Sequence, residues 1–246
     1  MKNERIDKLL FELGLAESIV QAQSLVMAGV VLVDEMRVEK PSETFSSERK
    51  IRLKTNLLQN KYVGRGGLKL EKALEYFHIC ADAYVCLDIG ASTGGFTDCL
   101  LQNRAKKVVT IDVGTNQIDW KLRNDKRVEV RENTNARYIK PEDFEEKFDL
   151  IVMDVSFISV TKIFPALILL IKETGKIISL IKPQFEVKKG EVSKGGIVRD
   201  EEIHKRIVSE INSFAELCGL KNAGVTESPI LGAEGNKEFL ALYERK

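Results

Sequence analysis

A glycine-rich turn near residue 90 has the residue types of a ligand-binding loop. Residues 87–98 read LDIGASTGGFTD, and the glycines at 90, 94 and 95 would let the backbone approach a ligand closely. The spacing departs from GxGxxG, so the dinucleotide fingerprint is absent. The carboxylate of Asp88 would repel a pyrophosphate, whereas S-adenosylmethionine carries a positively charged amino group and sulfonium. The turn therefore favours S-adenosylmethionine over a dinucleotide.

A second carboxylate follows at the distance that a nucleoside ligand would need. Asp112 ends the next apolar run, 22 residues beyond Gly90, and an acid there can accept both ribose hydroxyls. Asn133 follows a third run and is a candidate for the adenine end, although an ordinary turn asparagine fits equally well. A tight strand–helix corner would explain the glycines alone, and a helix cap would explain Asp112 alone. The two features together favour cofactor binding. The candidate cofactor residues are Asp88, Gly90, Ser92, Gly94, Gly95, Phe96, Asp112, Asn133 and Asp154.

Four ionisable residues of alternating sign are predicted to meet beside this cofactor. Asp154 and Lys182 each come directly after an apolar run, in DLIVMDVSF and KIISLIKPQF. Lys69 opens the helix before the first strand, and Glu238 begins the last strand. Ligands in open α/β sheets bind beyond the carboxyl ends of the strands, where these residues would gather. A lone Asp or Lys is usually a solvated surface group, so the prediction depends on all four together.

The elements that would position these residues alternate between strand and helix from residue 68 onward. This alternation is typical of an α/β fold with a mostly parallel sheet that is covered on both faces. The last two strands lack an intervening helix, so the final strand is predicted to be antiparallel. The expected strands are 84–89, 108–113, 128–131, 150–155, 176–181, 223–226 and 238–243. One expected helix follows the glycine-rich turn and ends near residue 103, and two more span 163–171 and 201–218.

The first 59 residues have a different pattern and predict a small α+β domain. Apolar residues at helical spacing precede Gly14, and Ser18 can cap a second helix. The run VVLVDEMRVEK predicts two short strands around a tight turn at Asp34 and Glu35, and IRL predicts one more. The predicted organisation is a domain over 1–59, a glycine-rich linker over 60–67 and a larger domain over 68–246.

Composition limits the classes of protein and of site. The 246 residues include 38 Lys plus Arg against 37 Asp plus Glu, so any RNA contact must use local basic patches. The longest apolar stretch, 163–171, is too short to cross a bilayer, and the charged N-terminus does not resemble a signal peptide. We therefore expect a cytoplasmic protein without a membrane partner. Four cysteines without CxxC spacing and two histidines predict reduced thiols and no metal site.

The motifs RGGLKL, DIGASTGGFTD, IDVGTNQIDWKLRND, DVSFIS and IKPQFE resemble those of the TlyA-type ribosomal RNA 2′-O-methyltransferases, also known as hemolysin A. Their catalytic domain is similar to the FtsJ methyltransferases, and the N-terminal part resembles an S4 RNA-binding domain. The resemblance implies a Rossmann-like class I methyltransferase sheet and S-adenosylmethionine as methyl donor. It further implies a ribose 2′-hydroxyl as acceptor, usually of a cytidine in ribosomal RNA, with RNA or ribosomal subunits as partner. The family's Lys-Asp-Lys-Glu tetrad corresponds to Lys69, Asp154, Lys182 and Glu238.

The reaction implied by this resemblance suggests roles for the four residues. The ribose hydroxyl must lose a proton during or after its attack on the methyl group. Lys182 in its neutral form is the hypothesised acceptor. Lys69 and Glu238 would then orient Lys182 and hold the ribose and phosphate.

The basic residues available for RNA contact are few. Residues 1–59 contain nine basic and nine acidic residues, and Ile19 stands where S4 domains often have an arginine, so weak RNA affinity is expected from this domain alone. Solvated surface cations are an equally good reading for its candidates. Residues 187–200, VKKGEVSKGGIVRD, have the composition of a mobile loop over the site. The candidate RNA-binding residues are Arg5, Lys8, Arg37, Arg65, Lys69, Lys188, Lys189 and Arg199.

Three other functions compete with ribose methylation. The segment DVSF faintly resembles the D/N-P-P-Y/F motif of nucleobase amino-methyltransferases, but the prolines are missing and Lys182 is present. A membrane-lytic protein would fit the hemolysin name, but no amphipathic membrane stripe supports it. A catalytically silent RNA-binding module is the third alternative, and the intact cofactor turn counts against it. The sequence carries no signal for an oligomeric state.

Overall fold

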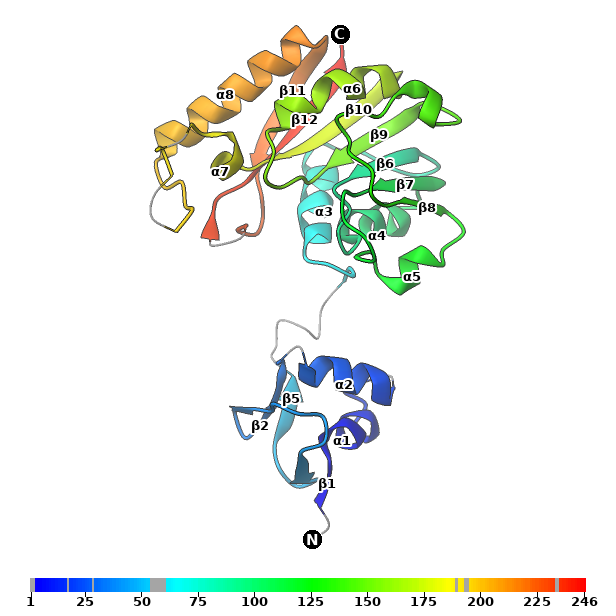
Figure 1. The fold of residues 1–246 in the computed structure, drawn as a ribbon, viewed down its shortest axis with the longest axis vertical. Coiled ribbons are helices and arrows are strands. Elements are labelled where there is room, and N and C mark those ends of the chain that lie inside the picture. The colour runs from blue at the N-terminus through cyan, green and yellow to red at the C-terminus, as the bar shows by residue number, and fades with distance from the viewer. Residues whose placement is uncertain are drawn as a thin grey trace. The chain divides into compact units, whose positions relative to one another are not determined.

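The computed structural model describes residues 3–16, 18–27, 29–53, 61–188, 190–192, 195–232 and 235–246. The chain divides into two compact units, residues 1–60 and 61–246 (Figure 1).

The N-terminal unit combines two helices with short strands. Helices α1 (Ile6–Glu12) and α2 (Ile19–Met27) pack on each other. Their apolar faces share a core with the central strand, in which Leu10, Ala22 and Val31 are fully buried. Strand β2 (Val31–Val33) lies between β3 (Met36–Arg37) and β5 (Ile51–Leu53), and β1 (Asn3–Arg5) pairs antiparallel with β4 (Thr44–Ser46).

Local chemistry explains two of these elements. Ser18 caps α2, because its Oγ accepts a hydrogen bond from the backbone N–H of Gln21 at 3.1 Å. Asp34 and Glu35 have φ of 50° and 69°, the left-handed pair that a two-residue hairpin turn requires between β2 and β3. The sequence predicted the cap and the turn. It did not predict β1 and β4, because three residues are too few to display a strand's alternation.

The second unit is built on one seven-stranded sheet with the order β11–β12–β10–β9–β6–β7–β8. Strand β12 is antiparallel to both of its neighbours, and the pairs from β10 through β9, β6 and β7 to β8 are parallel, which confirms the predicted mostly parallel sheet with an antiparallel last strand. The strands are β6 (Val85–Ile89), β7 (Lys107–Ile111), β8 (Val128–Arg131), β9 (Phe148–Met153), β10 (Ile171–Ile181), β11 (Leu220–Glu227) and β12 (Phe239–Arg245).

Helices cover both faces of this sheet (Figure 1). On one face, Cys86 and Leu150 join a core with Leu70 and Leu100 from α3 (Gly66–Tyr76) and α4 (Gly95–Gln102). On the other face, a second core includes residues of α6 (Phe164–Leu170) and α8 (Glu201–Leu217). The remaining elements are α5 (Trp120–Arg123), α7 (Pro183–Glu186), which packs on α8, and the 3₁₀ turns η1 (Pro141–Asp143) and η2 (Val160–Lys162).

The segment interpreted as a linker packs against the second unit. Residue 60 lies outside the described residues, but Tyr62 is buried in the core beside α3, and Gly66 already begins that helix. The backbone N–H of Val63 donates to Asp98 Oδ2 of α4 at 2.8 Å. The glycines here allow α3 to pack closely against the segment before it, since a side chain at Gly67 would collide with Tyr62. None of the helices in the described ranges has the length and apolar character needed to cross a bilayer.

Candidate active site

The polar residues singled out in the sequence gather at one edge of the seven-stranded sheet. Asp112, Asp154 and Lys182 lie one residue beyond the carboxyl ends of β7, β9 and β10. Glu238 immediately precedes β12, and because that strand runs in the opposite direction, its beginning reaches the same edge. Strands β7 and β9 end two residues before their predicted limits and β10 ends where predicted, while the side chains converge as expected.

A cleft of about 470 Å³ opens between the ends of β6, β7 and β9. Its wall includes Gly90, Ser92 and Asp112, together with apolar side chains such as Ile158. Asp112 is fixed by two backbone donors, the N–H of Ser92 on Oδ2 and the N–H of Gly114 on Oδ1, both at 2.8 Å. Each carboxylate oxygen keeps the capacity for a further hydrogen bond, so Asp112 can still accept ribose hydroxyls.

Glycines hold the turn beside this cleft in place. Gly90 and Gly94 have φ of +80° and +96°, a region that residues with a Cβ rarely adopt. A side chain at Gly90 would collide with the main-chain oxygen of Asp154, and one at Gly94 would collide with Leu122 of α5. The turn therefore lies tightly between two neighbouring segments, with its exposed side toward the cleft.

Asp88 lies beneath the turn and is fully buried. Its Oδ2 accepts a hydrogen bond from Thr97 Oγ1 at 2.6 Å, while Oδ1 has no hydrogen-bond partner in the described part of the chain. Burial raises the pKa of the Asp88 carboxyl to about 7, and the hydrogen bond from Thr97 opposes that rise. An orphaned carboxylate oxygen at this place would be stabilised by positive charge in the cleft.

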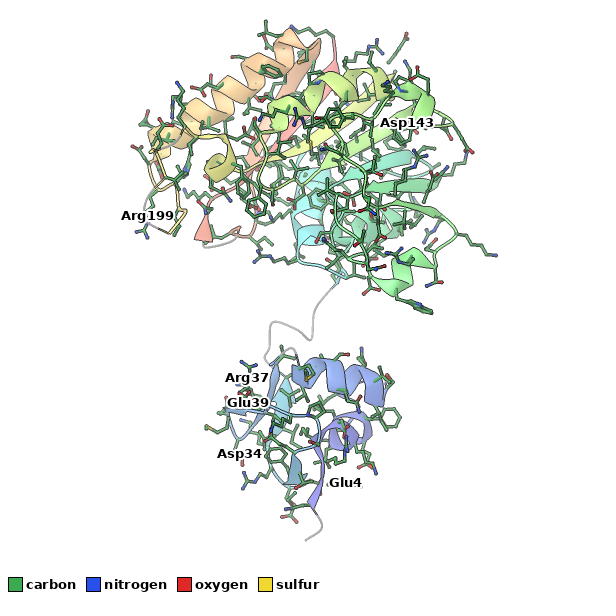
Figure 2. All side chains as sticks on the ribbon, viewed as in Figure 1. Glu4, Asp34, Arg37, Glu39, Asp143 and Arg199 are labelled. Atoms are coloured by element: carbon green, nitrogen blue, oxygen red, sulfur yellow. The ribbon has the colours of Figure 1, made fainter. Side chains whose placement is uncertain are left out.

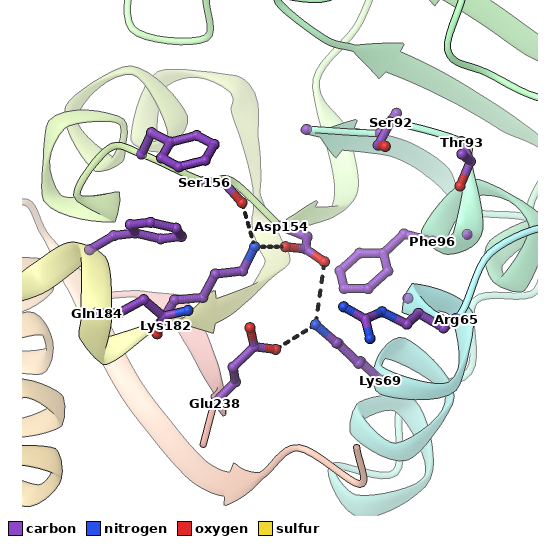
Figure 3. Close-up of a pocket in the computed structure, with 16 residues that line it drawn as sticks. Arg65, Lys69, Ser92, Thr93, Phe96, Asp154, Ser156, Lys182, Gln184 and Glu238 are labelled. Atoms are coloured by element: carbon purple, nitrogen blue, oxygen red, sulfur yellow. Dashed lines mark hydrogen bonds and ion pairs between the residues drawn. The ribbon is translucent and has the colours of Figure 1, made fainter. Parts of the chain in front are cut away.

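The four ionisable residues surround a second cavity, of about 340 Å³, which adjoins the cleft (Figure 3). Lys69 Nζ donates to Glu238 Oε2 and lies 3.9 Å from Asp154 Oδ2. Lys182 Nζ lies 2.5 Å from Asp154 Oδ1. Lys69, Lys182 and Glu238 are less than a tenth exposed. The charges therefore alternate along one chain, Glu238–Lys69–Asp154–Lys182, and compensate each other away from bulk water.

Three residues that the sequence analysis did not select complete this cavity. Ser156 Oγ accepts a hydrogen bond from Lys182 Nζ at 2.9 Å. Phe157 is 91% exposed and has a φ of 64°, and its ring lies 5.0 Å from that of Phe185. The available signal was their place in the motifs DVSFIS and IKPQFE, two or three residues after Asp154 and Lys182.

The structure distributes the predicted cofactor residues between several positions. Gly90, Ser92 and Asp154 line both cavities, and Asp112 lines the cleft. Gly95 and Phe96 line the cavity of the four charges instead. Asp88 and Gly94 support the turn from behind. Asn133 is exposed and lines neither cavity, whereas Thr134, Asn135 and Ala136 line the cleft.

Some of the predicted RNA-contacting residues are paired with carboxylates, and others are not paired with any described residue. Arg65 lines the cavity beside Lys69, with no ion pair among the described residues (Figure 3). Arg199 is exposed at a loop tip (Figure 2), and Lys188 is exposed. Arg5 instead makes two hydrogen bonds to the buried Asp7, and Arg37 lies 3.7 Å from Glu39. Lys8 is exposed on α1, and Lys189 lies outside the described residues.

Comparison with known proteins identifies the family. Residues 62–245 match the FtsJ-like methyltransferases, and residues 4–51 match the S4 domain. The chain belongs to the FtsJ-like methyltransferase family. Hemolysin A of Brachyspira hyodysenteriae is 45% identical over 243 residues, 97% of this chain and 99% of that protein. The 16S/23S rRNA (cytidine-2′-O)-methyltransferase TlyA of Mycobacterium tuberculosis is 42% identical over 238 residues, 97% of this chain and 88% of that protein.

A solved structure agrees with this membership. A hemolysin-named protein from Streptococcus thermophilus is 44% identical and superposes with a TM-score of 0.77, covering 100% of this chain and 90% of that one. The fold is thus that of a methyltransferase sheet with an N-terminal S4 domain. The resemblance seen in the sequence is confirmed over nearly the whole chain.

Membership of the FtsJ-like methyltransferases implies S-adenosylmethionine as methyl donor, and the cleft fits that molecule. Its lining combines the Asp112 carboxylate, which can accept hydrogen bonds from ribose hydroxyls, with apolar side chains for adenine, and the orphaned Oδ1 of Asp88 lies beneath the turn. The volume lies within the range of small-molecule sites. Within the described ranges, no group of three or more His, Cys, Asp or Glu side chains is arranged to hold a metal ion.

Proposed function

We propose that this protein is an S-adenosylmethionine-dependent methyltransferase that modifies the ribose 2′-hydroxyl of a cytidine in ribosomal RNA. The observation that carries the proposal is the shared wall of the two cavities. Gly90, Ser92, Asp154, Ser156 and Phe157 line both the cofactor cleft and the cavity of the four charges. A hydroxyl bound beside Lys182 would therefore face a methyl group held in the cleft, with no protein layer between them.

Lys182 is the residue placed to accept the hydroxyl proton. Bound S-adenosylmethionine supplies a methyl group on a positively charged sulfur, which departs as a neutral thioether. The ribose oxygen forms the new bond to the methyl carbon, and its proton passes to the neutral amine of Lys182. Because the methyl group is already activated, correct alignment of the ribose oxygen accounts for much of the rate.

Lys69 and Glu238 support this step from the opposite side of Asp154. Glu238 accepts a hydrogen bond from Lys69, which leaves Asp154 between two lysines. The Lys69 cation therefore shares the Asp154 carboxylate with Lys182 and would help to orient it. Arg65 lies next to Lys69, makes no ion pair with any described residue, and would hold a phosphate of the RNA chain (Figure 3).

The aromatic residues at the cavity rim suit an extruded nucleotide. Phe157 exposes nearly all of its side chain, and together with Phe185, whose ring is tilted by 54° from its own, it forms an aromatic edge beside Lys182. Enzymes that modify a nucleotide within folded RNA must expose it, and stacking on aromatic rings stabilises the unpaired base. The remaining partner surface is proposed to include Arg199, Lys188 and the S4 domain, which would dock on ribosomal RNA.

Transfer of a labelled methyl group to unmodified ribosomal subunits tests this function. The wild-type protein should label ribosomal RNA, and the labelled link should resist alkaline cleavage because its 2′-oxygen is blocked. Label on a base, or label that remains sensitive to alkali, would contradict ribose methylation.

The Lys182→Ala variant tests the proposed proton acceptor in the same assay. It should bind S-adenosylmethionine and RNA normally but lose about 100-fold or more in turnover, since general-base catalysis contributes about 10²- to 10⁴-fold. Near-wild-type turnover would remove Lys182 from the mechanism. Lys205→Ala is a matched control, because Lys205 is exposed on α8 and pairs only with Glu202 among the described residues.

A further inference from the structure

Ser156 contacts the amine of Lys182 directly. Its Oγ lies 2.9 Å from Lys182 Nζ, and Asp154 Oδ1 lies 2.5 Å from the same nitrogen. These two oxygens are the only hydrogen-bonding or ion-pairing partners of Nζ in the described part of the chain. Figure 3 draws both contacts, with Asp154 and Ser156 side by side above the lysine.

Two oxygens fix the direction of the amine. With Asp154 and Ser156 each accepting one N–H of Nζ, rotation about the last C–N bond of the side chain is fixed. The third tetrahedral position of the nitrogen has no protein partner among the described residues, and Lys182 lines the cavity where the ribose would bind. In the neutral amine that the proposed reaction requires, that third position would carry the lone pair.

We propose that Ser156 is a positioning residue that, together with Asp154, directs the lone pair of Lys182 toward the ribose hydroxyl. This inference rests on the proposed function, since it concerns how the proton acceptor of that reaction is aimed. With Asp154 alone, the amine would rotate about a single hydrogen bond and sample orientations from which the proton cannot be taken. After transfer, the new ammonium still has its two acceptors, and its third N–H faces the methylated oxygen.

Ser159 provides a matched control in the same loop. Its Oγ accepts the backbone N–H of Thr161 at 3.2 Å and caps η2, and no hydrogen bond joins it to Lys182. A Ser159→Ala variant thus removes one serine hydroxyl and loosens the loop without changing the surroundings of Nζ. Loss of the local cap should lower the melting temperature and leave turnover nearly unchanged.

Steady-state kinetics of Ser156→Ala, Ser156→Thr and Ser159→Ala on ribosomal subunits test the inference. Ser156→Ala should lower kcat about 10- to 100-fold, the effect of one hydrogen bond to a charged group, while KM for RNA and the Kd of S-adenosylmethionine change less than about 2-fold. Ser156→Thr, which keeps the hydroxyl, should recover most of kcat. Ser159→Ala should stay within about 2-fold of wild-type kcat.

Several results would overturn the inference. Wild-type kcat in Ser156→Ala, equal losses in Ser156→Ala and Ser159→Ala, or a Thr variant as slow as the Ala variant would each do so. These outcomes differ from failure of the proposed function, in which the wild-type protein itself would not methylate ribose.

Discussion

Asp88 in the second unit has a carboxyl whose pKa is raised well above its ordinary value. Its carboxyl has a pKa near 7 because it is fully buried, whereas in the unfolded chain it ionises near the ordinary value of 3.8. Between these two values the folded state holds a proton that the unfolded state has lost. The free energy of unfolding therefore falls as pH rises through this window, with a slope of about 1.4 kcal/mol per pH unit from this group.

The Asp88→Asn variant isolates that contribution. Its amide cannot ionise, so the difference in unfolding free energy between wild type and variant should decrease from about pH 4 to about pH 7 and become constant above pH 7. Urea denaturation of both proteins at a series of pH values measures the difference. A difference that does not vary with pH would show that the buried carboxyl titrates normally.

The Lys69–Glu238 pair has a structural role in addition to its proposed catalytic one. Both side chains are no more than 5% exposed, so removing Glu238 leaves the buried Lys69 charge with only the Asp154 carboxylate, 3.9 Å away, among the described residues. Glu238→Ala should lower the unfolding free energy by about 3 kcal/mol or more. The double variant Lys69→Met/Glu238→Leu should regain most of that stability while methyl transfer stays lost. Denaturation curves paired with transfer assays would detect the alternative, in which activity returns together with stability.

At the scale of elements, the glycine turn combines a conformational requirement with a packing requirement. Gly94→Ala would force a Cβ into a left-handed backbone and against Leu122 of α5. The affinity for S-adenosylmethionine should fall at least about 10-fold as the turn moves, which titration calorimetry can measure. Gly190→Ala is the matched control, because Gly190 has a φ of +103° with open space around it. Equal losses in the two variants would exclude the collision as the cause.

The elements also show where the sequence was sufficient. Long apolar runs predicted strands such as β9 and β10, and the absence of a helix between β11 and β12 predicted the reversed last strand. Tyr62 and Gly67 were misread because glycine-rich composition marks both a flexible linker and a close helix contact. Asn133 was selected from its position after β8, but the backbone turns there with a φ of 53° and presents Asn135 to the cleft instead.

The charged residues of the site could be predicted from the positions of the strand ends, whereas its neutral residues could not. Asp154 and Lys182 were predictable because a charged residue directly after a buried strand has few structural reasons to be there. Ser156, Phe157 and Phe185 acquire their roles from side-chain directions that only the folded chain defines.

For the whole molecule, a formal net charge of +1 limits how strongly RNA is attracted at long range. We propose that affinity for ribosomal RNA comes from a few cations that make no ion pair among the described residues, such as Arg65 and Arg199. Arg199→Ala should therefore reduce the slope of log affinity against log salt by about 0.7 to 0.9, the effect of one phosphate contact. Binding measured from 50 to about 200 mM salt checks this. Arg127→Ala, which removes a cation already paired with Asp125, should leave the slope unchanged.

The four charges come from positions spread between residues 69 and 238, with the Lys69–Glu238 pair separated by 169 residues. The cofactor cleft, in contrast, is lined entirely by residues 89–163. During synthesis on the ribosome, the cleft would therefore emerge well before β12 inserts and brings Glu238 to Lys69. Because Glu238 reaches Lys69 only at that point, the chain of alternating charges is complete only once the last strand has joined the sheet.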